Sequence, residues 1–315
     1  MGGEVMYFPY FRGRMYELIA LKELAVGKLL GKSIIPVVEP IKITSTFDSM
    51  LNAFNNADLN LAVIYNPEVG DLSSESNTID MLSSKLLSCS NVIPSVLMNE
   101  DADSVVMALE SKKILKKDIL AVLDKRDFVE NYTDLFEISY PKYTLALNER
   151  QIRRNIKNGK ILFEDKFIKR ERNADYLKEE DEFFSDDHLY YSEEGYDGFG
   201  DYSIIGNEYA DGGFAPRAVA IHIVYFDKEN ALRIHHFVSD SNSDISDVAG
   251  KFHEAVVKLR NWYENGQKHQ LTSALQTLLN HAKEGTYPGL PTVKKLSIMH
   301  HLELIGKHLD RYEIR

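Results

Sequence analysis

The chain is poor in cysteine and in long apolar segments. Cys89 is the only cysteine among 315 residues. A single thiol cannot form an intrachain disulfide, and it cannot complete a zinc site made of several cysteines. No apolar run is long enough to cross a bilayer, and the first residues lack the basic and apolar segments of a signal peptide. These absences predict a cytoplasmic protein without a membrane partner.

Sequence signals for nucleotide binding and for common metal motifs are also absent. No glycine-rich phosphate loop follows the first apolar segment, and the glycines of GDYSIIG at residues 200–206 have no phosphate-loop lysine beside them. The spacings His-x-His and His-Glu-x-x-His do not occur. Serine or cysteine nucleophiles with a recognisable histidine partner are not evident either. The sequence therefore gives no indication of nucleotide-dependent or nucleophilic chemistry.

Basic residues are missing from one long acidic stretch. The formal net charge of the chain is -11, and residues 179–202 contain no Lys or Arg. A surface of this kind repels phosphate backbones and anionic lipids. Nucleic acid is therefore not an expected partner, although residues 111–117 and 169–172 form small basic clusters. The acidic residues of the stretch are Glu179, Glu180, Asp181, Glu182, Asp186, Asp187, Glu193, Glu194, Asp197 and Asp201.

Aromatic residues alternate with these acids, which is unusual for a disordered tail. They are Phe183, Phe184, Tyr190, Tyr191, Tyr196, Phe199 and Tyr202. Two interpretations remain open. The stretch can be a solvated loop, as runs of like charge usually are. Alternatively, it is an ordered insertion that packs its rings inward and presents the remaining acids to a cationic protein partner or a metal.

Short apolar runs alternate with helical patterns through the first two thirds of the chain. The predicted strands span residues 5–11, 33–41, 60–66, 91–99, 118–126, 143–149, 160–167 and 217–226. The predicted helices between them span residues 14–30, 46–57, 79–88, 101–112, 127–137 and 150–158. Eight strands that alternate with helices are typical of a (β/α)8 TIM-like barrel. A doubly wound open sheet is the alternative, although it usually has fewer strands.

The fold prediction has two further parts. An acidic insertion, at about residues 168–216, precedes the last predicted strand, and a β-hairpin extension and C-terminal helices follow that strand. The helices are expected at residues 247–263, 270–283 and 292–310. We therefore predict an α/β fold in which residues 5–226 form the barrel. Residues 227–315 are predicted to form a hairpin and helical cap that packs on it.

Polar residues at the predicted strand ends are the candidates for a functional site, because barrel enzymes place their sites where strands run into loops. Glu39, Asp124 and Asp165 can converge at one mouth and act as acid and base or hold a divalent cation. Each of them can equally cap the helix that follows. The predicted binding residues are Arg12, Asn66, Arg126, Asn148 and Tyr225. Arg12 and Arg126 are expected to clamp an anion.

His222 is the fourth predicted catalytic residue. Strand alternation in the run at residues 219–226 places His222 on the face with Ala220 and Val224, which we expect to line the barrel interior. A lone histidine in a strand is more often a core residue than a ligand. Because His235, His236 and Asp240 follow on the next strand, a divalent metal site is an alternative role.

Several segments together resemble the Beta protein family of bacteria and phages. They are YFPYFRGRMYELIALKEL, IIPVVEP, FGDYSIIG, AVAIHIVYF, HHFVSD and AGKFHEAV, in this order. The likeness extends from residue 7 to about residue 259. It implies a setting in phage defence or mobile-element biology. The resemblance implies no reaction, so no catalytic residue follows from it.

Two functions follow as hypotheses. In the first, the barrel acts on or binds a small polar or phosphorylated molecule at its mouth. In the second, the protein is a non-catalytic scaffold that binds a protein partner through the acidic aromatic insertion and the C-terminal helices. The sequence does not decide whether the protein is an enzyme, and it carries no signal for an oligomeric state.

Overall fold

A computed structural model gives the structure of the chain. It describes residues 6–87, 89–210, 212, 216–266 and 270–313. The residues at which the chain starts, 1–5, on which the signal-peptide prediction partly depends, lie outside these ranges. Within the ranges, none of the helices combines the length and the apolar character that a bilayer span requires.

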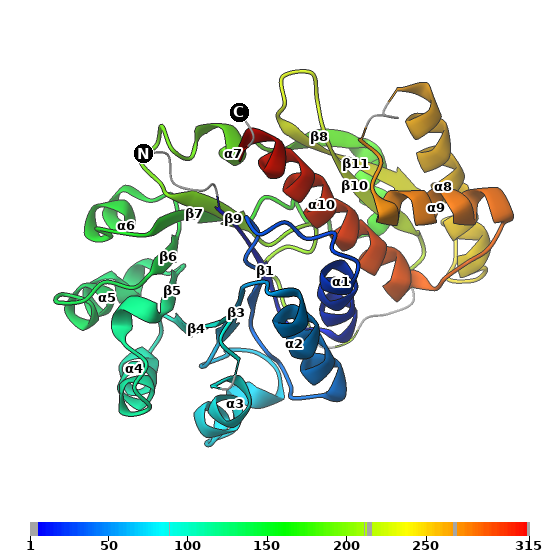
Figure 1. Ribbon diagram of the computed structural model, residues 1–315. Coiled ribbons are helices and arrows are strands. Elements are labelled where there is room, and N and C mark those ends of the chain that lie inside the picture. The colour runs from blue at the N-terminus through cyan, green and yellow to red at the C-terminus, as the bar shows by residue number, and fades with distance from the viewer. Residues whose placement is uncertain (1–5, 88, 211, 213–215, 267–269, 314–315) are drawn as a thin grey trace.

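Eight parallel strands close into a barrel, so the predicted fold class is confirmed (Figure 1). The barrel strands are β1 (Met6–Phe11), β2 (Val37–Val38), β3 (Leu61–Ile64), β4 (Val92–Leu97), β5 (Leu120–Leu123), β6 (Tyr143–Ala146), β7 (Lys160–Glu164) and β9 (Gly198–Asp201). Helices follow the first six strands: α1 (Met15–Val26), α2 (Ser45–Ala57), α3 (Thr78–Leu86), α4 (Ala102–Ser111), α5 (Val129–Leu135) and α6 (Arg150–Asn155).

The eighth barrel strand is β9, and the prediction of residues 217–226 for this position was wrong. In β9, Gly200 pairs with Phe8 of β1 and with Phe163 of β7, which closes the ring. A Cβ atom added to Gly200 would lie 2.4 Å from the Phe8 carbonyl oxygen, so only glycine fits there. Glycine has a low strand propensity. For this reason the GFGD segment, at residues 198–201, has no recognisable strand pattern in the sequence.

The segment predicted as the eighth strand instead forms β10 (Ala220–Phe226) of a second, antiparallel sheet. Its order is β10, β11 (Leu232–Val238) and β8 (Asp181–Ser185). β8 lies inside the predicted insertion, together with the short helices η4 (Asn173–Lys178) and α7 (Asp187–Tyr190). The predicted hairpin at residues 217–240 is therefore present. The predicted domain boundary at residue 226 falls between its two strands.

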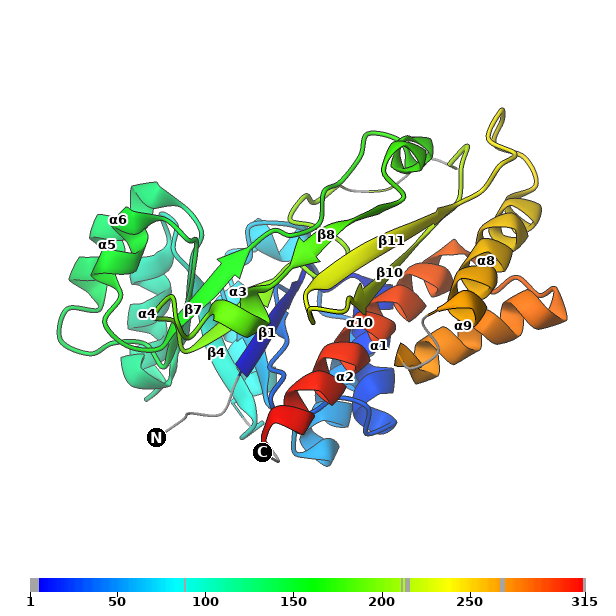
Figure 2. The ribbon, with the colours of Figure 1, turned by 90° about the horizontal axis from the view of Figure 1, so that it is seen from above.

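Three C-terminal helices cover this sheet and join it to the barrel. They are α8 (Val248–Asn265), α9 (Ser273–Glu284) and α10 (Leu290–Glu313). On α8, Trp262 packs its ring against Tyr225, with ring centroids 5.1 Å apart. α10 packs on α1 and on β10, and it thereby fills the gap in the helical layer beside the first helix. Figure 2 shows the antiparallel sheet beside the barrel, with α8 and α9 on its far side.

The described part of the insertion folds against the rest of the protein, and several of its aromatic residues are core residues. Phe184 of β8 and Tyr196 are 2% and 3% exposed, whereas Phe183, which points to the opposite face of β8, is 51% exposed. Several of the acids are also engaged internally. Asp181 binds Arg233, Glu182 binds Arg170, and Asp187 binds Lys166. These three acids are therefore paired within the fold and are not free to bind a cationic partner.

Candidate functional site at the barrel rim

The side chains that point inward fill the barrel, and the same alternation extends into the residues that follow the strands. Side chains alternate along a strand, so residues at every second position point inward. The inward side chains Tyr10, Val37, Ile64, Leu97, Val122 and Phe163 form one buried cluster. Two positions further along each of these strands, and after Gly200 of β9, stand Arg12, Glu39, Asn66, Asn99, Asp124, Asp165 and Tyr202. We call these seven residues the rim residues.

Five predicted site residues belong to this rim, namely Arg12, Glu39, Asn66, Asp124 and Asp165. They follow the carboxyl ends of β1, β2, β3, β5 and β7 respectively. Parallel strands have all their carboxyl ends on one side of the barrel, which is where barrel enzymes bind their substrates. The structure therefore places these residues at one mouth. Their catalytic and binding roles stay predictions.

Glu39 is the anchor of the rim. Its side chain is fully buried, and it accepts hydrogen bonds from the Tyr10 hydroxyl at 2.8 Å and from the Glu68 backbone N–H at 2.7 Å. It also forms an ion pair with Arg12. A second Arg12 nitrogen donates to the Asn207 carbonyl oxygen at 2.8 Å. The guanidinium is therefore already engaged, which reduces its capacity to clamp an anion as predicted.

A polar chain continues from Glu39 along the rim. The Asn66 amide donates to Asn99 Oδ1 at 2.9 Å and to the Leu97 carbonyl oxygen at 2.8 Å. The Asn99 amide donates to Glu68 Oε1 at 3.1 Å, and Lys125 donates to both Glu68 carboxylate oxygens at 2.8 Å. These bonds fix the loops that follow β3, β4 and β5. Asn66 thus has a positioning role in the structure.

Asp124 and Tyr202 differ from their neighbours, because neither side chain makes a hydrogen bond or an ion pair to another described residue. Asp124 is half-buried. Burial raises the pKa of Asp124, and Lys125 opposes part of that rise. Burial also raises the pKa of Tyr202, and Asp124 is the nearby charge that contributes most to this increase. A carboxylate and a phenol hydroxyl therefore both belong to the rim without a hydrogen-bond partner among the described residues.

Asp165 fastens a loop across the mouth. Its carboxylate accepts the backbone N–H groups of Phe167 at 3.0 Å and of Asn207 at 2.8 Å. The same loop contacts the first strand's end, where Arg14 donates to the Ala210 carbonyl oxygen at 2.8 Å. The segment at residues 203–210 consequently runs over the rim from Asp165 to Arg12.

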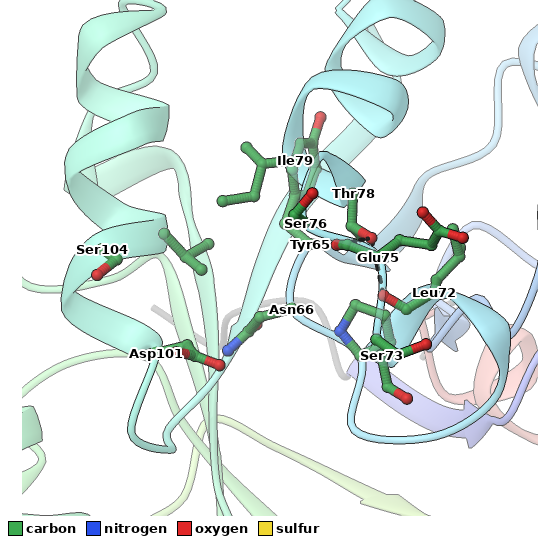
Figure 3. A pocket seen from close by; sticks show the side chains of 13 residues that line it. Tyr65, Asn66, Leu72, Ser73, Glu75, Ser76, Thr78, Ile79, Asp101 and Ser104 are labelled. Atoms are coloured by element: carbon green, nitrogen blue, oxygen red, sulfur yellow. Dashed lines mark hydrogen bonds between the residues drawn. The ribbon is translucent and has the colours of Figure 1, made fainter.

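A pocket of about 320 Å³ opens in the rim beside Asn66. It lies between the loops that follow β3 and β4, and Figure 3 shows Asp101 and Ser104 across the pocket from Ser73 and Ser76. The Thr78 hydroxyl donates to the Leu72 carbonyl oxygen at 2.7 Å in its wall. Most of its polar side chains carry hydroxyl groups, and Glu75 and Asp101 are its charged residues.

Two other predicted binding residues lie on the same side of the barrel but outside the inward register. Arg126 forms an exposed ion pair with Glu149. Asn148 accepts a hydrogen bond from the Tyr196 hydroxyl at 3.0 Å and so connects the sixth strand's end to the insertion. These contacts account for both side chains without a ligand.

His222 and Tyr225 do not lie at the mouth, which corrects the predictions that His222 lines the barrel interior and that Tyr225 binds a ligand at the mouth. Both belong to β10, in the antiparallel sheet. The predicted alternation itself is confirmed, because His222 contacts Phe167 and Tyr176 on one face while Tyr225 contacts Trp262 on the other. Strand alternation is identical in a barrel and in a hairpin, so the pattern could not distinguish the two.

The described residues give no support to a metal site. No group of three or more His, Cys, Asp or Glu side chains among them is arranged to hold a metal ion. This applies to the rim carboxylates and to the histidines of the hairpin. His235 forms an ion pair with Asp181, and His236 contacts Glu182, so these two histidines have partners of their own.

A second buried polar cluster, behind the barrel wall, was missed at the level of sequence. Asp201 Oδ1 accepts hydrogen bonds from the Tyr7 hydroxyl at 2.7 Å and from the Ser203 N–H at 2.6 Å. The Ser203 hydroxyl lies 2.9 Å from His301 Nδ1. Burial raises the pKa of Asp201 to about 7, although the Tyr7 hydrogen bond opposes it. The only sequence signal was a carboxylate in a glycine-rich strand.

This raised pKa predicts that stability falls as the pH rises. The folded protein keeps the Asp201 proton up to about pH 7, whereas the unfolded chain loses it near pH 4, so stability is lost between these values. Between pH 5 and pH 8, we expect the free energy of unfolding to fall by on the order of 2–3 kcal/mol less in Asp201→Asn than in the unmodified protein. Urea unfolding at pH 5 and pH 8 would measure it. Equal pH dependence in both proteins would contradict the expectation.

The chain was also compared with known proteins. No protein-family model matches it, and no curated protein matches it either.

Proposed function

We propose that the protein binds a small polar molecule at the barrel rim, and that Asp124 and Tyr202 contact this molecule. One observation carries the proposal. Asp124 and Tyr202 both lie in the inward register of the rim and form no hydrogen bond to another described residue, whereas the other rim residues are held by hydrogen bonds. An unpaired carboxylate in a partly buried position is unfavourable for folding. Such groups are typical of binding sites, where a ligand supplies the missing partner.

The charge of the rim favours a neutral or amine-bearing ligand over a phosphorylated one. Glu39 neutralises Arg12, and Glu68 neutralises Lys125. Asp124 has no ion-pair partner among the described residues, so the remaining charge beside Tyr202 is negative. A phosphate group would be repelled there, whereas hydroxyl or ammonium groups can donate to Asp124, and a hydroxyl can also accept from Tyr202.

The chemistry of these groups supports ligand binding more directly than a particular reaction. Asp124, with its raised pKa, can accept a proton or a hydrogen bond from a ligand. Glu39 has its oxygens committed to Tyr10, Arg12 and Glu68, so we assign it a positioning role.

Matched sugars provide the test of the ligand class. We expect glucose or glucosamine, added at millimolar concentration, to raise the melting temperature and to shift amide resonances of rim residues. Glucose 6-phosphate should bind at least about tenfold more weakly, since repulsion of about 1.4 kcal/mol corresponds to that factor. Preferential binding of the phosphorylated sugar would refute the charge argument. No binding of any of the three would refute this ligand class.

Asp124→Asn tests the site itself. Removal of a half-buried, unpaired charge should stabilise the free protein by about 1 kcal/mol, or about 2–4 °C. The same variant should lose the sugar-induced shift. Asp127→Asn is the control, because Asp127 is an exposed carboxylate three positions away. A destabilised Asp124→Asn variant that still binds sugar would mean that Asp124 is a structural residue.

The partner-scaffold hypothesis has less support, because the rings and many acids of the insertion are used within the fold. Phe183 and Tyr190 are its exposed aromatics, at 51% and 47%. From the sequence alone, we also propose that the protein acts in phage defence or mobile-element biology and that it is cytoplasmic. The resemblance to the Beta protein family supports the former.

A further inference from the structure

A cavity of about 560 Å³, lined by none of the seven rim residues, lies between the insertion, β10 and α10. Its walls combine apolar side chains with a few polar groups. Phe167 and Tyr176 come from the insertion, Val219 and His222 from the hairpin region, and Lys294 from α10. Ligand sites typically have this composition, with an apolar lining and a small number of polar groups that orient the ligand.

A chain of hydrogen bonds ends at this cavity. His236 Nε2 lies 3.0 Å from Glu182 Oε1, and His236 Nδ1 lies 2.7 Å from His222 Nδ1. His236 and Glu182 are 1% and 8% exposed. The second oxygen of Glu182 pairs with Arg170 at 2.7 Å. The chain therefore runs from a buried, paired carboxylate through one imidazole to a second imidazole.

The chain determines where the protons lie. The Glu182 carboxylate only accepts, so His236 donates its Nε2–H to it. In a neutral His236, Nδ1 is then a bare acceptor, and His222 must donate its own Nδ1–H to that atom. The remaining nitrogen of His222, Nε2, consequently carries a lone pair. Burial lowers the pKa of both histidines, which keeps both rings neutral near pH 7.

His222 Nε2 is open to the cavity. His222 makes no further hydrogen bond to a described residue, and Nε2 is not among the buried atoms that lack a partner. The ring is only partly exposed and is held edge-on against Phe167 and Tyr176, with ring centroids 5.2 Å and 4.7 Å away. A fixed acceptor therefore faces the space that these rings enclose.

Lys294 supplies a cation in the same wall. Lys169 and Arg170 also line the cavity, but they pair with Glu208 and Glu182. Lys294 forms no ion pair within the described part of the chain. Burial lowers the pKa of Lys294, and Glu17 opposes part of that decrease. Lys294 and His222 both line this cavity.

We propose that this cavity is a second binding site, for a small organic anion that has an apolar body and a hydroxyl group. The anionic group pairs with Lys294, the hydroxyl donates to His222 Nε2, and the body packs against Phe167, Tyr176 and Val219. Glu182 and His236 act as positioning residues, because they fix the tautomer of His222. This site does not depend on the function proposed for the rim.

Three probes separate the two contacts: 3-hydroxybenzoate has both groups, benzoate lacks the hydroxyl, and 3-hydroxybenzyl alcohol lacks the anion. We expect 3-hydroxybenzoate to bind about tenfold more tightly than either, since one such contact is worth about 1.4 kcal/mol. Isothermal titration of the full chain would measure this. Equal affinity for the three probes, or no binding of 3-hydroxybenzoate at millimolar concentration, would overturn the proposal.

Two substitutions of His222 test its two ring nitrogens separately. His222→Asn keeps an amide near the Nδ1 position, where it can still bond His236, but removes the Nε2 acceptor. It should lower affinity for 3-hydroxybenzoate about tenfold and leave benzoate unchanged. His222→Gln places its amide near the Nε2 position and should restore part of the loss. Lys294→Met should weaken the binding of both carboxylates, whereas His253→Asn, on the exposed face of α8, should change neither affinity. Unchanged binding in His222→Asn would exclude His222.

Nitrogen-15 spectra of histidine-labelled protein test the tautomer directly. We expect a protonated Nδ1 and a bare Nε2 for His222, and 3-hydroxybenzoate should shift the Nε2 resonance. Glu182→Gln should change this proton pattern, because its amide can donate to His236. A His222 protonated at Nε2 in the free protein would overturn the proposed acceptor, even if a ligand binds.

Discussion

Truncating Phe184 to alanine is expected to destabilise the protein by about 3–5 kcal/mol, the range typical of large aromatic residues lost from a core. Phe184 lies on β8, is 2% exposed and packs edge-on against His301 of α10, with ring centroids 5.4 Å apart. Its removal leaves a cavity where the insertion, the antiparallel sheet and α10 meet. Urea unfolding followed by tryptophan fluorescence would report the change, because Trp262 of α8 packs against Phe237 of the same sheet.

Phe183→Ala provides the matched control on the neighbouring position. Phe183 is 51% exposed, so its truncation should change stability by no more than about 0.5 kcal/mol. Deletion of residues 179–196 should have the largest effect and prevent cooperative folding, because it removes β8 and exposes the edge of β11. A stable deletion variant would contradict the structural role and revive the partner-binding hypothesis for the insertion.

The alternating apolar segments were sufficient to predict seven barrel strands and the helices around them, because each strand carries enough branched and aromatic side chains to be recognised. The eighth strand was not recognisable. Gly198 and Gly200 lack the side chains that define a strand pattern, and they are required because Met6 and Phe8 approach closely from β1. The strongest strand signal nearby, at residues 217–226, belongs to the antiparallel sheet instead.

The rim could be predicted in part, because barrel sites lie where strands run into loops and polar residues stand at the predicted strand ends. Glu39, Asp124 and Asp165 were found in this way. Their differences in function could not be predicted, since these depend on partners that are distant in sequence. Glu39 is engaged by Glu68 and Arg12, whereas Asp124 is not engaged. The Glu182–His236–His222 chain was invisible for the same reason, because β8 joins β11 only in three dimensions.

These differences among the rim carboxylates lead to a second large effect. Glu39→Ala should destabilise the protein by about 3–5 kcal/mol, because it leaves the buried Arg12 charge without its partner. The side chains of Glu39 and Arg12 are 0% and 16% exposed. The Tyr10 hydroxyl and the Glu68 N–H would also lose their acceptor. Denaturant unfolding would measure the loss.

A double-mutant cycle separates the ion pair from the other contacts. Arg12→Ala combined with Glu39→Ala should cost about 0.5–3 kcal/mol less than the sum of the single variants, because no unpaired charge remains. Glu149→Ala breaks the exposed pair with Arg126 and should cost about 0.2–1 kcal/mol. If Glu39→Ala costs no more than Glu149→Ala, Glu39 does not anchor the rim. Its carboxylate would then be free for the acid–base role that its position at a strand end first suggested.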